Sequence, residues 1–405
     1  MADQGRSVRL VLCTQGQVLG ALPPFPVQVP WWPEVGEIIG AARERYGLDV
    51  SVLRLIGWPS DRRAGGEVSY LAELATPSEL DAEILDALAP WPGDPLAPHR
   101  FRQPWAEPGG PAEAVQWAAA RLADRGIAVT GTAEQIKSWN LSAIWRLPTS
   151  AGPMWLKCVP DFFAHEGAMI DAIGAPLAPR LIAFEPGRIL MAEIDGEDHH
   201  EATGPVLPPM IELLTTEQAR WLGRVDELLA LGLPDRRLDS LLPRMAEVTD
   251  AYADQLGESD RRALADLIAT LPRRIDALAD CGIPDTLVHG DFHPGNVRGG
   301  AGRYVILDWG DSAVGHPLTD ELAFTRRLDD ADRAAAATRF AQAWQNLIPG
   351  CAPVRAVDLL RPVSPLIAAV QYADFLDAIE PDEHIYHAAD PAEMLRQAAS
   401  LAINL

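Results

Sequence analysis

The sequence HGDFHPGN occupies residues 289–296, and DWGD follows at residues 308–311. Asp291 can accept a proton from an attacking hydroxyl group, while Asn296 and Asp308 offer the oxygen ligands that Mg²⁺ prefers beside phosphates. The apolar run Tyr-Val-Ile-Leu directly before DWGD predicts a short strand that fixes Asp308 at the same place. The pattern favours phosphoryl transfer to a hydroxyl group, with Asp291 as the base and Asn296 and Asp308 as metal ligands.

The order of these residues resembles the catalytic and metal loops of protein kinases. Gly290, where protein kinases carry arginine, and the full string HGDFHPGN resemble the aminoglycoside phosphotransferase and choline kinase-like branch. The resemblance covers about residues 113–405. It implies an α+β, bilobal protein kinase-like fold with a small antiparallel sheet lobe at 113–195 and a helical lobe at 196–405. It also implies ATP and Mg²⁺ as cofactors.

The same resemblance assigns residues in the sheet lobe to the nucleotide. Lys157 stands where the family places the lysine that binds the α and β phosphates, and Glu166 where it places the helix glutamate that pairs with it. A lone lysine on an apolar strand also needs a counter-ion, which the next helix can supply. Residues 189–196 resemble the hinge, so main-chain groups of Ala192 and Ile194 are expected to meet the adenine edge.

Several polar residues around these motifs have two interpretations each. The turn at 138–143 lacks the usual glycines, so it is either a phosphate cover or a plain hairpin. His289 and His293 are expected to be structural. Asp311 can add to the acidic metal environment, and Asp320 can cap a helix that starts at Glu321.

The C-terminal part contains an acidic stretch without intervening Lys or Arg. Its members are Asp374, Asp377, Glu380, Asp382, Glu383, Asp390 and Glu393. The stretch is either a solvated helix end or a wall that binds a cationic acceptor such as an aminoglycoside.

Residues 1–85 have the element order of a small α/β domain. Strands are predicted at 8–12, 50–56 and 68–74, and a helix at 35–46. The layout resembles a Nudix fold, in which helix glutamates hold a divalent metal beside a pyrophosphate. Of that cluster only Glu44 is in register, and Arg45 replaces a second metal-binding glutamate. The expectation is therefore a Nudix-like domain without hydrolase chemistry.

Residues 86–112 form a proline-rich linker whose Trp91, Phe101 and Trp105 are expected to pack on neighbouring structure. Patterns downstream of the linker predict further elements. Helices are expected at 112–125, 163–173, 213–231, 261–281, 330–347, 364–379 and 391–402, and strands at 135–139, 142–147, 154–159 and 189–192.

Composition limits the partners of the chain. The net charge of −23 over 405 residues argues against nucleic acid and against anionic lipid surfaces. Four scattered cysteines suggest buried thiols rather than zinc or disulfides. Because the sequence has no leader pattern and no apolar run of membrane-spanning length, a cytoplasmic protein is expected.

These observations favour an ATP-dependent small-molecule O-phosphotransferase with a hydroxyl acceptor. One alternative is a non-catalytic pseudokinase that senses a nucleotide or metabolite and recruits a partner through the Nudix-like domain. Another is a Nudix hydrolase with an appended kinase domain. The missing metal-binding glutamates of the Nudix-like helix argue against it. The sequence does not determine the acceptor, the choice of ATP or GTP, the role of the first domain or the oligomeric state.

Overall fold

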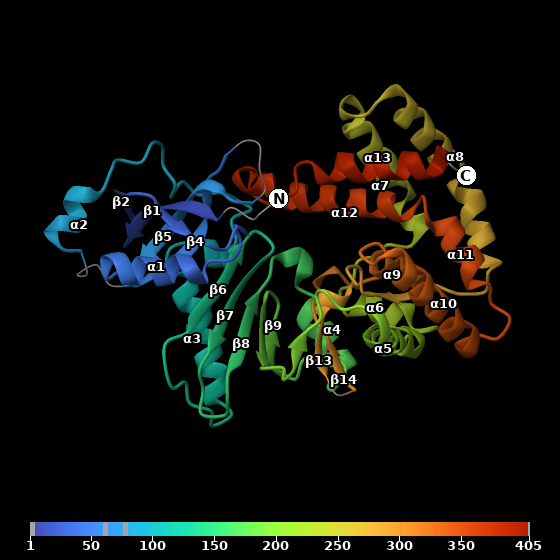
Figure 1. The fold of residues 1–405 in the computed structure, drawn as a ribbon, viewed down its shortest axis with the longest axis horizontal. Helices are drawn as coiled ribbons and strands as arrows, with labels where there is room; N and C mark the ends of the chain where they lie inside the picture. The colour runs from blue at the N-terminus through green and yellow to red at the C-terminus, as the bar shows by residue number, and fades with distance from the viewer. Residues whose placement is uncertain (1–4, 60–63, 76–79, 301, 404–405) are drawn as a thin grey trace. The chain divides into compact units, whose positions relative to one another are not determined.

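The computed structural model describes residues 5–59, 64–75, 80–300 and 302–403, which form a mixed α+β structure (Figure 1). Residues 1–4, in which the sequence analysis found no leader pattern, lie outside the described residues. The chain divides into two compact units. The first contains Met1–Phe162, Ile182–Glu193 and Ala378–Tyr386, and the second contains Phe163–Leu181, Ile194–Asp377 and His387–Leu405. The domain division inferred from the sequence stays a prediction.

The N-terminal part of the first unit is a mixed sheet with one long helix. Its elements are β1 (Arg6–Thr14), β2 (Gln17–Ala21), β3 (Phe25–Val27), α1 (Gly36–Tyr46), β4 (Val50–Gly57) and β5 (Gly66–Leu74). The strand order is β2-β1-β5-β4, with β3 also on β1 and only the β1–β5 pair parallel. Strand β1 is buried on both faces, because Leu10 and Leu12 enter one apolar cluster and Val11 and Cys13 another. The strands and helix expected here are confirmed.

Glu37 and Glu44, the acidic residues of α1, have different surroundings. The Glu37 carboxylate accepts hydrogen bonds from two backbone N–H groups of the preceding loop, at 2.8 and 3.0 Å. Glu44 and Arg45 are exposed, and the Arg45 guanidinium lies 5.8 Å from the centre of the Phe25 ring. Glu37 thus has a structural role in the loop. The Nudix-like character of the domain stays a prediction.

Glu44→Gln in the full chain is expected to leave phosphate release from nucleotide sugars and dinucleoside polyphosphates unchanged. The reason is that Glu44 alone cannot assemble a metal cluster, and a guanidinium occupies the neighbouring position. The measurement is a phosphate assay with Mg²⁺ and with Mn²⁺. Steady turnover that Glu44→Gln abolishes would make the domain a working hydrolase.

A second sheet follows in the first unit. It contains β6 (Glu134–Trp139), β7 (Ser142–Leu147), β8 (Met154–Cys158), β9 (Leu181–Glu185) and β10 (Arg188–Ala192), in the order β6-β7-β8-β10-β9. Helix α3 (Gly110–Ala123) covers one face, where Ala118 and Leu122 share a cluster with Leu156 and Leu190. The β6–β7, β7–β8 and β8–β10 pairs are antiparallel, as expected. Strand β9 was not predicted.

The N-terminal sheet and the edge strand β6 are joined by backbone and side-chain hydrogen bonds. Val35 N donates to Ile136 O at 3.0 Å, and Ser138 N donates to Pro33 O at 2.9 Å. The Gln135 side chain bonds both backbone groups of Val52, at 2.8 and 2.9 Å. An uncovered edge strand is a site for unwanted pairing, so the N-terminal domain protects this edge.

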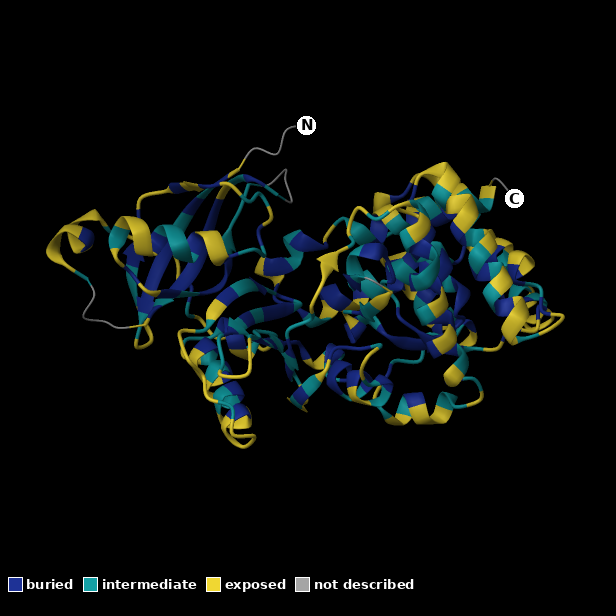
Figure 2. Ribbon diagram, turned by 60° about the horizontal axis from the view of Figure 1, so that its bottom comes forward, coloured by how far each residue is buried: buried dark blue, intermediate teal, exposed yellow. Residues whose placement is uncertain are grey.

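Helices dominate the second unit, and Figure 2 shows many of them with a buried and an exposed side. They are α4 (Glu166–Ile173), α5 (Leu207–Arg220), α6 (Val225–Ala230), α7 (Leu238–Ala251), α8 (Glu258–Ala279), α9 (Leu318–Thr325), α10 (Asp330–Leu347), α11 (Pro353–Leu360), α12 (Ser364–Ala378) and α13 (Asp390–Ile403). Their core includes Met245, Leu264, Trp344, Leu366 and Leu395. Among the described residues, none of these helices combines the length and apolarity needed to cross a membrane.

Two helix predictions need correction, and two helices were not predicted. The helix expected at 213–231 is two helices, because the chain leaves helical geometry after Arg220 and Gly223 adopts a φ of 73°. Helices α7 and α11 were not predicted. Helix α9 begins at Leu318, so Asp320 lies in its first turn rather than at its cap.

Glu321 of α9 is 4% exposed, and burial raises the pKa of its carboxyl group to about 8 in spite of the nearby Arg361. The pKa of Glu321 in the folded protein lies above its ordinary value of 4.5, so the protonated carboxyl group favours the folded state. This contribution to the folding free energy is fully present below about pH 4.5 and is lost as the pH rises through about 8. Glu321→Gln should therefore stabilise the protein by about 2.5 kcal/mol more at about pH 9 than at about pH 6. Denaturant unfolding measures this difference, and an equal effect at both pH values would contradict it.

Candidate active site

The motif residues follow short strands of the second unit. Strand β12 (Thr286–Val288) pairs with β15 (Ala313–Gly315) and leads into the loop at residues 289–296. The hairpin of β13 (Val297–Gly300) and β14 (Arg303–Ile306) then returns the chain to Asp308. Two hydrogen bonds join the loops, from Leu307 N to Asn296 O at 2.8 Å and between His289 Nε2 and Leu307 O at 2.7 Å. The strand expected before Asp308 is confirmed, and it ends beside the catalytic loop.

Asp291 is half-exposed, and its loop fixes its orientation. Asn296 Nδ2 donates to the Asp291 backbone oxygen at 2.9 Å and to Asp291 Oδ2 at 3.3 Å. His293 Nε2 lies 3.5 Å from the same carboxylate oxygen. One oxygen is thus held by neighbours while the side chain stays 41% exposed, which suits a group that must reach an acceptor.

Asp308 has a φ of 73° and a ψ of 64°, the left-handed region that non-glycine residues rarely adopt. Such conformations cost on the order of 1–3 kcal/mol and cluster at functional sites. The Asp308 side chain is exposed, at the end of β14. Among the described residues, no group of three or more His, Cys, Asp or Glu side chains is placed to hold a metal ion. The assignment of Asn296 and Asp308 as metal ligands stays a prediction.

Asp320 supports the start of the catalytic loop. Its buried carboxylate accepts hydrogen bonds from His289 N at 2.8 Å and Gly290 N at 2.9 Å, and Gln218 Nε2 donates to it at 2.8 Å. Burial raises its pKa to about 7. The sequence offered only a helix cap for Asp320, because its loop partners lie about 30 residues upstream.

Close packing around the loop explains why glycine occupies position 290 and histidine position 289. Gly290 has a φ of 88°, and a Cβ there would lie 2.2 Å from the Asp311 backbone oxygen, so only glycine fits. The His289 ring is buried, with its centre 4.7 Å from that of Trp309 and 5.8 Å from that of Phe292. Burial lowers the pKa of His289, which favours a neutral ring. These contacts agree with the structural role expected for His289.

The predicted nucleotide residues lie in both units. Glu166, at the start of α4, is 1% exposed, and a Cβ on Gly310 would lie 3.4 Å from Glu166 Oε2, so this carboxylate lies beside the DWGD turn. Lys157 lies on β8 opposite Ile144 and Ile189, in the first unit. The Lys157–Glu166 pair therefore stays a prediction.

The hinge residues have backbone contacts of their own. Ala192 ends β10 opposite Met154. Ile194 O accepts a hydrogen bond from Arg298 Nε at 2.9 Å, so one acceptor position of this carbonyl group is occupied. The contacts of Ala192 and Ile194 with adenine stay predictions.

Residues 162–357 match the sequence profile described as "APH: Phosphotransferase enzyme family". This part of the chain is similar to the APH phosphotransferase family. Its catalytic loop, DWGD turn and helices α4 to α10 all lie within the match. The resemblance inferred from HGDFHPGN is confirmed, and no curated protein matches the chain.

Several solved structures are similar to this chain, and the first of the following three supports the fold. A candidate aminoglycoside phosphotransferase from Ralstonia eutropha JMP134 is 17% identical with a TM-score of 0.50, covering 72% of this chain and 98% of that one. A macrolide 2'-phosphotransferase from Brachybacterium faecium is 15% identical with a TM-score of 0.48, covering 70% and 97%. A choline/ethanolamine kinase family protein from Mesorhizobium loti is 15% identical with a TM-score of 0.45, covering 72% and 99%. The α+β protein kinase-like fold class is confirmed.

Asn140, Ser142 and Asp311, which had two interpretations each, form hydrogen bonds within the protein. In the turn at 138–143, Asn140 Nδ2 donates to Glu383 O at 3.5 Å and Ser142 Oγ accepts from Trp139 Nε1 at 3.0 Å. Both side chains are buried, so any phosphate contact from this turn falls to its backbone. Asp311 Oδ1 accepts a hydrogen bond from Gln371 Nε2.

The acidic stretch is not a continuous wall. Asp374 and Asp377 are exposed but ion-paired with Arg244, Asp374 at 2.9 Å. Glu380 is buried and ion-paired with Arg102 at 2.8 Å, and Glu383 is 3% exposed. Both interpretations of the stretch therefore need correction, because partners distant in sequence bind or bury its central members.

Proposed function

We propose that this chain is an ATP-dependent, Mg²⁺-requiring O-phosphotransferase that acts on a hydroxyl group of a small molecule. The observation that carries the proposal is the loop geometry, in which Asn296 Nδ2 donates to two oxygens of Asp291 and Leu307 N, next to Asp308, donates to Asn296 O. The match of residues 162–357 to the APH phosphotransferase family supports the same reaction class. Asp291 would orient the acceptor hydroxyl group and accept its proton.

The donor set suits a hard cation. Because Nδ2 of Asn296 is bonded to Asp291, its Oδ1 remains for a metal, and Asp308 adds a carboxylate. Bound Mg²⁺ would neutralise charge on the transferred phosphoryl group. Lys157, held by Glu166, is proposed to bind the α and β phosphates, and the backbone at Ala192 and Ile194 the adenine. Rate acceleration then comes from positioning and electrostatics, without a covalent intermediate.

An acceptor screen tests the proposal. ADP release is followed over aminoglycosides, macrolides, amino sugars and amino alcohols, with ATP and with GTP as donors. Acceptor-dependent ADP release is expected from at least one compound, and mass spectrometry should find that compound heavier by one phosphate group. Tight Mg·ATP binding without transfer to any acceptor would favour the sensing pseudokinase instead.

A further inference from the structure

The turn between β6 and β7 is held from several sides within the first unit. Asn140, at its tip, is 1% exposed and donates to Glu383 O at 3.5 Å. Trp105 Nε1 donates to Trp139 O at 3.1 Å. The Trp139 ring packs edge-on against Tyr386, with centres 5.5 Å apart. These contacts join the turn to the proline-rich linker and to residues 379–386, which we call the return segment.

The return segment is fixed by a buried ion-pair network. Arg102 binds Glu380 through two hydrogen bonds, Nε to Oε1 at 3.0 Å and Nη2 to Oε2 at 2.8 Å. Arg54 Nε lies 3.7 Å from Glu380 Oε1, and Arg54 Nη2 donates to Pro95 O at 2.6 Å. The side chains of all three charged residues are at most 5% exposed. Two-point arginine–carboxylate pairs fix geometry as well as charge, so the network sets the position of the segment.

Aromatic packing adds a second attachment. Tyr386 at the end of the return segment is buried in the core of the N-terminal sheet, with its ring centre 6.1 Å from that of Trp32. Trp32 is itself fully buried and donates from Nε1 to Gly65 O at 2.9 Å. The N-terminal domain and the linker thus hold both ends of the return segment, Glu380 through charge and Tyr386 through packing.

The turn itself lacks the residues that would let it adapt to a nucleotide. Residues 138–143 contain no glycine, so an induced fit around phosphates has little backbone freedom available. A loop that is already ordered loses less conformational entropy when a ligand binds. External attachment of the turn can therefore replace the adaptable glycine-rich loop.

We infer that the N-terminal domain and the return segment position the β6–β7 turn for the nucleotide, with Arg54, Arg102, Glu380 and Asn140 as positioning residues. The inference rests on the proposed function and on the interpretation of residues 138–143 as the cover of the ATP phosphates. It gives the N-terminal domain a role in the kinase reaction itself. Loosening the network should weaken ATP binding, while the phosphoryl-transfer step is unchanged once ATP is bound.

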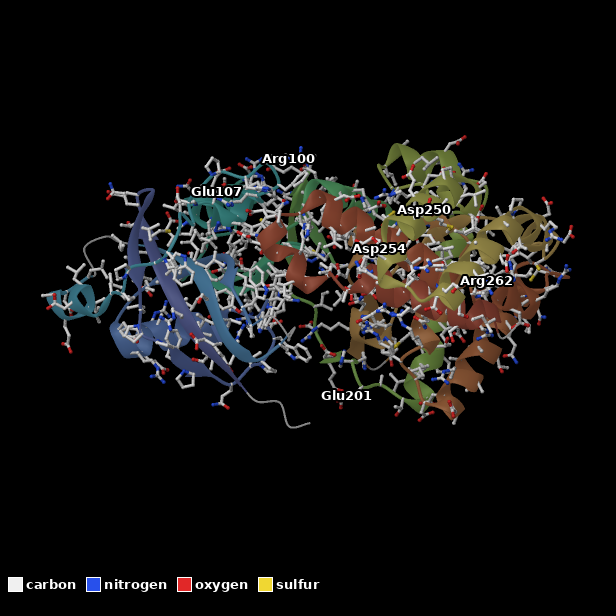
Figure 3. All side chains as sticks on the ribbon, turned by 90° about the horizontal axis from the view of Figure 1, so that it is seen from above. Arg100, Glu107, Glu201, Asp250, Asp254 and Arg262 are labelled. Atoms are coloured by element: carbon white, nitrogen blue, oxygen red, sulfur yellow. The ribbon has the colours of Figure 1, made fainter. Side chains whose placement is uncertain are left out.

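The test uses the full chain with Glu380→Gln, Asn140→Leu and the double variant. Glu380→Gln loosens the return segment without touching the turn, and Asn140→Leu keeps side-chain bulk but removes the donor. Arg262→Met is the matched control, because Arg262, labelled in Figure 3, forms an exposed ion pair with Glu258 on α8. Calorimetry gives the Kd of Mg·ATP, steady-state kinetics give KM and kcat, and hydrogen exchange follows the amides of residues 139–142.

Each single variant should raise the Kd and KM for ATP by about three- to tenfold, as expected for loss of one hydrogen bond or charge contact, with kcat within about twofold. The Kd of Mg·ATP should rise in the double variant by less than the product of the two single increases, because both substitutions act through the β6–β7 turn. Amide exchange at residues 139–142 should be faster in Glu380→Gln and unchanged in Arg262→Met.

Unchanged ATP affinity and unchanged exchange in a folded Glu380→Gln protein would overturn the inference. A fall in kcat alone would also overturn it. If the wild-type chain bound no ATP but exchange at the turn still increased in Glu380→Gln, the proposed function would fail and the positioning of the turn would stand.

Discussion

Asp291→Ala should lower turnover by about 10²–10⁴-fold, the usual contribution of a general base, while the Kd of Mg·ATP stays within about twofold. The different effects on turnover and on ATP affinity follow from the geometry of the loop. The Asp291 carboxylate is 41% exposed and hydrogen-bonded to Asn296, and the proposal assigns it to the acceptor hydroxyl group, whereas Lys157 and the metal are assigned to ATP. Turnover and calorimetry on the same preparation measure the two quantities.

Asp291→Asn is the matched variant for this prediction. Asparagine keeps the side-chain shape and an oxygen that can accept from Asn296 Nδ2, so the loop should remain folded, while the amide cannot take a proton. Both variants should be equally impaired. A rate above about a tenth of the wild-type rate in either variant is outside the range expected for a lost base and would remove Asp291 from that role.

Asp308→Asn should weaken Mg²⁺-dependent ATP binding by at least about tenfold, because a neutral amide replaces a carboxylate ligand. Asparagine is the informative substitution here. Asp308 has a φ of 73°, and asparagine tolerates this left-handed conformation better than most residues, so the backbone should not change. The effect can then be assigned to the lost charge.

Calorimetry of ATP with and without Mg²⁺ measures this effect. Asp330→Asn is a suitable control, because the Asp330 side chain is 98% exposed at the start of α10. The control should bind Mg·ATP like the wild type, and Asp308→Asn should bind metal-free ATP no worse than the wild type. Equal Mg·ATP affinity in Asp308→Asn and the wild type would exclude Asp308 from the metal site.

The catalytic loop could be predicted because its information is local. Asp291, Asn296 and Asp308 lie within 18 residues, and one strand pattern places Asp308 at the end of β14. The left-handed backbone at Asp308 and the glycine required at position 290 were not predicted, since both depend on tertiary contacts. The support from Asp320 was missed for the same reason.

The return segment shows the limit of sequence reasoning more clearly. Glu380 and Glu383 were grouped with Asp374 and Asp377 as one acidic stretch, because they are close in sequence. Glu380 instead binds Arg102, 278 residues away, and that pairing leaves no periodic pattern. Charge clusters in sequence indicate a shared surface only when each member lacks a distant partner.

The most direct test of the central claim is phosphorus NMR of ATP, Mg²⁺ and the best acceptor from the screen, with wild-type chain and with Asp291→Asn. With the wild type, the γ-phosphate signal should be replaced by that of a phosphate ester, in equal amount to the ADP formed and only when the acceptor is present. Asp291→Asn should leave ATP intact over the same period. Release of free phosphate without an ester, or equal ester formation by Asp291→Asn, would contradict a phosphotransferase in which Asp291 activates the hydroxyl group.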